Sequence, residues 1–206
     1  MLRTLACTAV LAATSMVSAA SGTAAAPSVT ISASRPSVVY GGSLTLSGRI
    51  SDSTAGQTVD VLAKAFDSAS FGKVASATTT ADGRWTQDVK PSTETSYEAS
   101  WMSATSSIVT VKVRPMITLA LVSRANRTFS TKVTAARSFA GKFVLVQRLS
   151  STGVATLKKV TLDANSSASF RVRLHRGRSR LRVVMPSSQT APGYITGTSN
   201  VLTVRV

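Results

Sequence analysis

The chain has 206 residues and a formal net charge of +16, and 43% of its residues are hydrophobic while 16% are charged. This length allows one or two domains, and the apolar fraction is sufficient for packed cores. A single histidine and a single cysteine exclude a transition-metal site with the usual number of ligands. Because Ser, Thr, Val and Ala dominate and no long stripe of 3.6-residue period occurs, the composition predicts an all-β fold.

The N-terminus has the features of a secretory signal peptide. A short positive region, Met1–Arg3, precedes the uncharged, Ala-rich run Leu5–Val17, and small residues follow at Ala24–Ala26. We expect residues 1–26 to be cleaved, with cleavage after Ala20 and an uncleaved membrane anchor as open alternatives.

The mature chain is therefore expected outside the cell. Cys7 lies inside the predicted signal peptide, so the exported chain has no cysteine and no disulfide framework. It also has no transmembrane segment and needs no cofactor. The sequence stops at Val206 directly after a predicted strand, so any attachment to the cell surface is expected to be non-covalent.

Charge divides the mature chain into two unlike halves. Residues 27–114 contain eight Lys/Arg and seven Asp/Glu, a net charge of +1. Residues 115–206 contain fifteen Lys/Arg and a single acid, Asp163, a net charge of +14. Such an asymmetry predicts that the second half meets an anionic partner.

Alternating apolar residues predict about seven short strands in the first half, separated by turn residues. The Asp82-Gly83 pair is the strongest hairpin-turn signal of the chain. The predicted strands cover Ser28–Ala33, Leu44–Ile50, Val59–Ala65, Val74–Thr80, Trp85–Val89, Tyr97–Trp101 and Ile108–Val113.

The second half repeats this order of strands. Phe129–Ala135 takes the place of Leu44–Ser51, Phe170 takes that of Trp85, and Val201–Val206 mirrors Ile108–Val113. Two units of this kind predict tandem β-sandwiches over residues 27–114 and 115–206. The junction Val113–Met116 has no flexible spacer, so we expect a stiff joint and an elongated molecule.

The turn and core motifs resemble those of tandem bacterial immunoglobulin-like domains in secreted proteins. The resemblance rests on Tyr40–Gly48, Ala55–Val59, Thr79–Trp85 and Lys90–Tyr97, and on the ending Ala191–Tyr194 of the less regular second unit. It implies a non-catalytic extracellular module, with Trp85 and Phe170 as core residues in place of an inter-sheet disulfide. These motifs specify a fold rather than a ligand.

The sequence argues against catalysis and against metal binding. His175 is the only candidate base, and it is surrounded by arginines with no carboxylate to orient it. Asp163 is expected to be a turn residue. The seven acids of the first half are scattered and form no calcium-binding loop, and no helix or phosphate-binding glycine loop is expected. We therefore predict that the protein is not an enzyme.

Three aromatic residues are candidates for a role in the core or in binding. Trp85 is interpreted as a core residue, with an exposed platform for carbohydrate as the alternative. Tyr97 is a candidate corner tyrosine whose hydroxyl would bond the backbone near Pro91. Tyr194, beside Gly193 in a loop, is equally compatible with packing and with a contact to a partner.

The segment Arg171–Arg182 holds six arginines and the only histidine. The repeat places its two strands in different sheets, with Arg171 and Arg173 on one outer face and Arg180 and Arg182 on the other. The residues between them would cross the end of the sandwich as a basic cap. The alternative is a solvated exterior without a ligand. The candidate residues for binding an anion or a partner are Arg171, Arg173, His175, Arg176, Arg178, Arg180, Arg182, Arg205, Phe143 and Leu145.

Phe143 and Leu145 belong to this set because of the strand period. If Val144 and Val146 point inward, then Phe143, Leu145 and Gln147 point outward and favour contact with a protein. The alternative is a β-bulge that reverses the parity and buries them.

Three functional classes remain open at the level of sequence. The first is a secreted, structural or adhesive protein that acts through surface contacts. The second is a module that binds an anionic cell-wall polymer or polysaccharide through the Arg-rich half. The third is an accessory subunit or inhibitor that uses the loops Asp67–Gly72 or Gln189–Ile195. Export and the lack of aromatic residues among the arginines argue against nucleic acid as the partner, and we expect a monomer.

Overall fold

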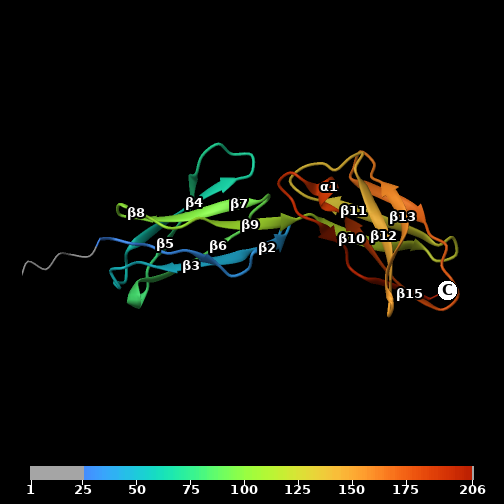
Figure 1. The fold of residues 1–206 in the computed structure, drawn as a ribbon, viewed down its shortest axis with the longest axis horizontal. Coiled ribbons are helices and arrows are strands. Elements are labelled where there is room, and N and C mark those ends of the chain that lie inside the picture. The colour runs from blue at the N-terminus through green and yellow to red at the C-terminus, as the bar shows by residue number, and fades with distance from the viewer. Residues whose placement is uncertain (1–25, 206) are drawn as a thin grey trace, which may run out of the picture.

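The structure is a computed structural model, and it describes residues 26–205. Residues 1–25, which include Cys7 and all but the last residue of the predicted signal peptide, and Val206 lie outside the described residues. The fold is all-β, as predicted, and the two halves follow one another along the longest axis (Figure 1). No helix among residues 26–205 is long and apolar enough to cross a membrane.

The first half contributes two sheets that face each other across a core. One has the order β1-β3-β6 and the other the order β2-β9-β7-β4-β5, with β8 added to β7. All pairs are antiparallel except β2 with β9. The elements are β1 (Ser32–Ala33), β2 (Ser37–Val39), β3 (Leu44–Arg49), β4 (Thr58–Ala65), β5 (Gly72–Thr78), the 3₁₀ turn η1 (Ala81–Gly83), β6 (Arg84–Val89), β7 (Thr95–Trp101), β8 (Ala104–Thr105) and β9 (Val109–Arg114).

The second half repeats this arrangement. Its sheets have the orders β10-β11-β14 and β13-β12-β15-β16, with β17 also paired to β15. The elements are β10 (Met116–Ser123), β11 (Thr128–Thr134), β12 (Phe143–Ser150), β13 (Gly153–Thr161), β14 (Ser167–Arg171), β15 (Arg178–Met185), the helix α1 (Ser187–Thr190), β16 (Gly197–Thr198) and β17 (Leu202–Arg205).

This strand order is the immunoglobulin-like arrangement predicted from the sequence. In the first half β5 pairs with β4, and in the second half β13 pairs with β12, rather than with β6 or β14. A sandwich of this order needs no disulfide when large apolar side chains fill the space between its sheets. The chain meets that need with the buried aromatics Trp85, Phe129 and Phe170.

Three details differ from the expectation. Each half has more than seven strands, because the edges are broken into short pieces such as β8 and β16. Asp82 and Gly83 form a tight turn with φ of 67° and 68°, but not a hairpin, since β5 and β6 belong to different sheets. One helical turn, α1, occurs where none was expected.

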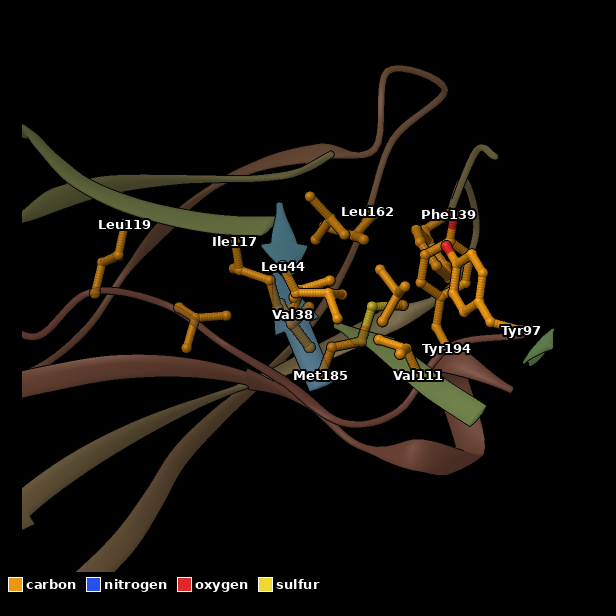
Figure 2. Packing of buried hydrophobic residues seen from close by; sticks show 14 of the residues in the cluster. Val38, Leu44, Tyr97, Val111, Ile117, Leu119, Phe139, Leu162, Met185 and Tyr194 are labelled. Carbon is orange, nitrogen blue, oxygen red and sulfur yellow. The ribbon is translucent and has the colours of Figure 1, made fainter. Parts of the chain in front are cut away.

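The joint between the halves is short and packed. Pro115 alone separates β9 from β10, and the loop after α1 lies against the first half. The Ile195 N–H donates to the Val113 carbonyl at 3.0 Å, and the Glu94 N–H donates to the Gly193 carbonyl at 2.9 Å. Buried side chains from both halves gather around this region (Figure 2).

Of the two roles left open for Tyr194, the structure shows packing, at the joint between the halves. Its side chain is only 4% exposed, its hydroxyl donates to the Ser92 carbonyl at 2.7 Å, and it accepts from the Ala136 N–H at 3.0 Å. Tyr97 was predicted to bond the backbone near Pro91, but its hydroxyl makes no such bond among the described residues. The loop beside Pro91 is instead held by Tyr194, which comes from the other half of the chain.

Candidate anion-binding surface

Strand β15 presents its arginines to solvent because of its period of two. Ser179, Leu181, Val183 and Met185 are buried, so Arg178, Arg180, Arg182 and Val184 point to the opposite, outer side of the sheet. Arg178 and Arg180 are exposed and Arg182 is half-buried. The inward positions carry the hydrophobic burial that holds the strand, which leaves the outward positions free for function.

The neighbouring strand β12 adds apolar side chains to the same face. Val144 and Val146 are fully buried, so Phe143, Leu145, Gln147 and Leu149 point outward, which is one of the two arrangements that the sequence left open. A bulge does occur beyond Val146, but the extra residue lies on β13, so the parity of β12 does not change. Phe143 and Leu145 are half-buried by their neighbours.

Contacts across the strands hold two of these side chains in place. The Arg182 Nε donates to the Gln147 Oε1 at 2.9 Å, and the Lys159 Nζ lies 3.9 Å from the centroid of the Phe143 ring. We call this surface the basic face. It consists of Phe143, Leu145, Gln147, Leu149, Lys159, Arg178, Arg180, Arg182, Val184, Thr203 and Arg205.

The basic face contains a pair of like charges. Arg178 on β15 stands directly opposite Arg205 on β17 in the strand register. Like charges in this position repel and destabilise a sheet. Beside them, Leu149, Arg178, Arg180, Val201 and Thr203 line a shallow depression of about 530 Å³.

The remaining predicted residues lie elsewhere on the same half. Arg171 is exposed on β14, in the sheet that lies across the core from the basic face. Arg173, His175 and Arg176 are exposed in the loop from β14 to β15, in which Val172 and Leu174 are buried. The structure therefore divides the arginine-rich segment between two sheets and the connection at the end of the sandwich. Two residues differ from the prediction, because β14 ends at Arg171 and leaves Arg173 in the connection, and β15 already begins at Arg178.

In the part of the chain that the structure describes, no carboxylate pairs with these cations. The only ion pair among residues 26–205 joins Lys73 to Asp60 at 2.7 Å, and it lies in the first half. Asp163, the single acid of the second half, is a turn residue as predicted, because its Oδ1 accepts from the backbone N–H groups of Asn165 and Ser167.

The equivalent face of the first half has a different chemistry. Val61 stands opposite Ala99 in the first half as Val146 stands opposite Val183 in the second. Counting back from these pairs, Glu98 is equivalent to Arg182 and Ser96 is equivalent to Arg180. Asp60 occupies the place of Leu145, and its hydrogen bond from Lys73 lowers the pKa of its carboxyl group. The same fold therefore forms without arginines or large apolar residues at these positions.

Arg124 and Arg127 also lie near the basic face, although the sequence pattern did not single them out. They lie in the turn between β10 and β11, which reaches the same end of the sandwich as the loop from β14 to β15. The pairing of β11 with β14 is the signal that could have revealed these two arginines. Because the strands are antiparallel, the start of β11 lies beside the end of β14, which brings the turn before β11 and the loop after β14 to the same end of the sandwich.

The structure offers little for catalysis or for a metal. No group of three His, Cys, Asp or Glu side chains within residues 26–205 is arranged to hold a metal ion. A cleft of about 440 Å³ opens between the sheets of the first half and is lined by Ala63, Ala65 and Ala75. Its one carboxylate, Asp88, accepts a hydrogen bond from the Thr45 hydroxyl at 2.6 Å.

Comparisons with known proteins find similarity only at the level of structure. No family model matches, and no curated protein matches. A tetra-tandem repeat in the extending region of a large adhesion protein shares 16% identity over 87% of this chain, with a TM-score of 0.38, and this chain covers 49% of that protein chain.

Two further solved structures are similar over a comparable share of the chain. Bovine butyrophilin shares 12% identity over 88% of this chain and 99% of its own, with a TM-score of 0.37. A marsupial T cell receptor shares 11% identity over 88% of this chain and 100% of its own, with a TM-score of 0.34. These scores are low and assign no function to this chain.

Proposed function

We propose that this is a non-catalytic, exported binding protein whose second half attaches it to an anionic polymer. The observation that carries the proposal is the basic face, in which arginines stand beside apolar residues and no acid within residues 26–205 pairs with them. Guanidinium groups bind phosphate, sulfate and carboxylate strongly, and an incoming anion would remove the repulsion between Arg178 and Arg205.

The spacing of the arginines favours a polymer over a single small anion. Outward residues of a strand repeat every second position, so Arg178, Arg180 and Arg182 are about 7 Å apart along β15. Charges repeated along an extended chain can meet all three and release several counterions together. The apolar residues of β12 would contact the uncharged parts of the same chain.

The first half serves as an internal comparison. Its equivalent face carries Ser96, Glu98 and Asp60, and it folds in the same topology. A solvated exterior requires only polar side chains. The single-sign charge of the second half is therefore better explained by a partner than by solubility, and a structural or adhesive role would follow from this attachment.

The test is retention of the chain from Pro27 onward on immobilised heparin and on poly(glycerol phosphate), measured against salt concentration. The variant Arg180→Ser/Arg182→Glu introduces the residues that the first half has at these positions. Each lost contact with a charged group reduces the slope of log K against log salt by about 0.7–0.9, so we expect the double variant to reduce it by about 1.5.

Two controls lower the net charge by two outside the basic face, against three in Arg180→Ser/Arg182→Glu. Lys90→Ser/Lys112→Ser removes two exposed positive charges from the first half, and Arg171→Ser/Arg173→Ser removes two from the other side of the second half. We expect a smaller loss of retention from either control. Retention that does not depend on salt and is unchanged in Arg180→Ser/Arg182→Glu would contradict the proposal and favour contact with a protein through Phe143 and Leu145.

A further inference from the structure

A pocket opens at the end of the second half that lies away from the first half, near the C-terminal end marked in Figure 1. Its volume is about 280 Å³. The lining residues are Leu121, Arg124, Ala125, Arg127, Phe129, Val204 and Arg205. They come from β10, β11, β17 and the turn between β10 and β11, so only the folded sandwich brings them together.

The floor of the pocket is apolar and belongs to the core. Phe129 is fully buried and stacks on Phe170, with ring centroids 5.9 Å apart. Val204 is buried and Leu121 is half-buried opposite Phe129. The pairing of β10 with β11 shifts register directly after Leu121, and the next residue, Val122, continues the outward row of β10 and is exposed. The floor is therefore a fixed surface that is built by packing.

The rim of the pocket is cationic. Arg127 lies in the left-handed region with a φ of 49°, and its Nη1 donates to the Leu174 carbonyl at 3.3 Å, which holds the guanidinium near the mouth. Arg124 and Arg205 complete the rim, and both are exposed. Asp163, the one acid of this half, is occupied in the turn between β13 and β14 at the opposite end. Three cations in one cavity, none of them paired with an acid within residues 26–205, favour an anion.

We propose that this pocket binds a compact apolar group that carries a carboxylate, sulfate or phosphate. At about 30 Å³ for each water-sized group, the cavity holds roughly nine heavy atoms, which is room for the apolar part of such a ligand, an aromatic ring or an alkyl chain of about eight carbons, with the anionic group at the rim. The apolar part lies on Leu121, Phe129 and Val204, and the anionic part meets the three arginines. This site is separate from the basic face, with only Arg205 in common, and does not depend on polymer binding.

The experiment is calorimetric titration of the chain from Pro27 onward with octyl sulfate below its micelle concentration. We expect one site, and at least tenfold weaker binding of inorganic sulfate, which lacks the apolar part, and of octanol, which lacks the charge. Arg124→Ser/Arg127→Asn should weaken octyl sulfate at least tenfold; asparagine is chosen because it tolerates positive φ. Arg124→Ser alone, in an exposed turn, should give part of this loss if the double variant is poorly folded.

Arg180→Ser/Arg182→Glu is the matched control, since it removes two arginines from the basic face and leaves the pocket intact. It should lose heparin retention and keep octyl sulfate binding, so the two proposals can fail separately. Three results would overturn the pocket proposal: an unchanged affinity of the rim variants for octyl sulfate, an equal affinity for inorganic sulfate, or binding of the protein to anionic vesicles without binding of monomeric octyl sulfate. Poly(glycerol phosphate) carries charge but no apolar group, so its displacement of octyl sulfate in the Arg180→Ser/Arg182→Glu variant would show that charge alone fills the site and would also overturn the proposal.

Discussion

Tyr194 links the two halves through its hydroxyl group, and Tyr194→Phe removes only that group. The Ser92 carbonyl loses its donor at 2.7 Å and the Ala136 N–H loses its acceptor at 3.0 Å. A hydrogen bond contributes about 1 kcal/mol net. Because Ser92 and Ala136 are exposed residues that water can partly satisfy, we expect the free energy of unfolding to fall by about 1–2 kcal/mol, or roughly 2–8 °C in Tm for a chain of this size.

Tryptophan fluorescence gives the right assay for this substitution. Both tryptophans of the chain, Trp85 and Trp101, are buried in the first half, whereas Tyr194 belongs to the second. A loss of stability that is detected by their fluorescence during urea unfolding would show that a second-half residue stabilises the first half. Tyr40→Phe is the control, since the Tyr40 hydroxyl makes no hydrogen bond within residues 26–205. If Tyr194→Phe left the fluorescence transition within 0.3 kcal/mol of the parent chain, or if Tyr40→Phe lowered it equally, the joint would not be coupled in this way.

Two further predictions concern the first half. A Cβ at Gly48 would lie 1.8 Å from the Thr30 carbonyl oxygen and 2.7 Å from the Trp85 ring, so Gly48→Ala should lower the free energy of unfolding in urea by more than about 3 kcal/mol. A Cβ at Gly72 would meet nothing within 4 Å, so Gly72→Ala should leave stability nearly unchanged. Equal effects of the two substitutions would contradict this reasoning. Burial raises the pKa of Tyr97 from 10.0 to about 12. The unfolded chain therefore ionises first as the pH rises, and the stabilisation, complete below pH 10, is lost between pH 10 and 12. At about 1.36 kcal/mol for each unit of pKa, this loss is about 2–3 kcal/mol. It should be smaller in Tyr97→Phe when unfolding is measured across that range, and an unchanged alkaline loss in that variant would rule out Tyr97 as its source.

The sequence alone determined the layers and the direction of most side chains. A strand with one buried face has apolar residues at every second position. This pattern alone placed Val144, Val146, Leu181 and Val183 in the core, where the structure has them. The internal repeat then assigned the strands of the arginine-rich segment to different sheets, because equivalent strands of one fold share a topology.

Only the tertiary structure decided which distant residues meet. The bond from Tyr194 to Ser92 spans 102 positions of sequence, and no local pattern distinguishes Tyr194 from Tyr97 as its donor. Arg124, Arg127 and Arg205 form one pocket because β10, β11 and β17 bring them to the same end of the sandwich. Periodicity reports which side of a strand is buried, but long-range contacts depend on the packing of whole sheets, which the order of residues does not display locally.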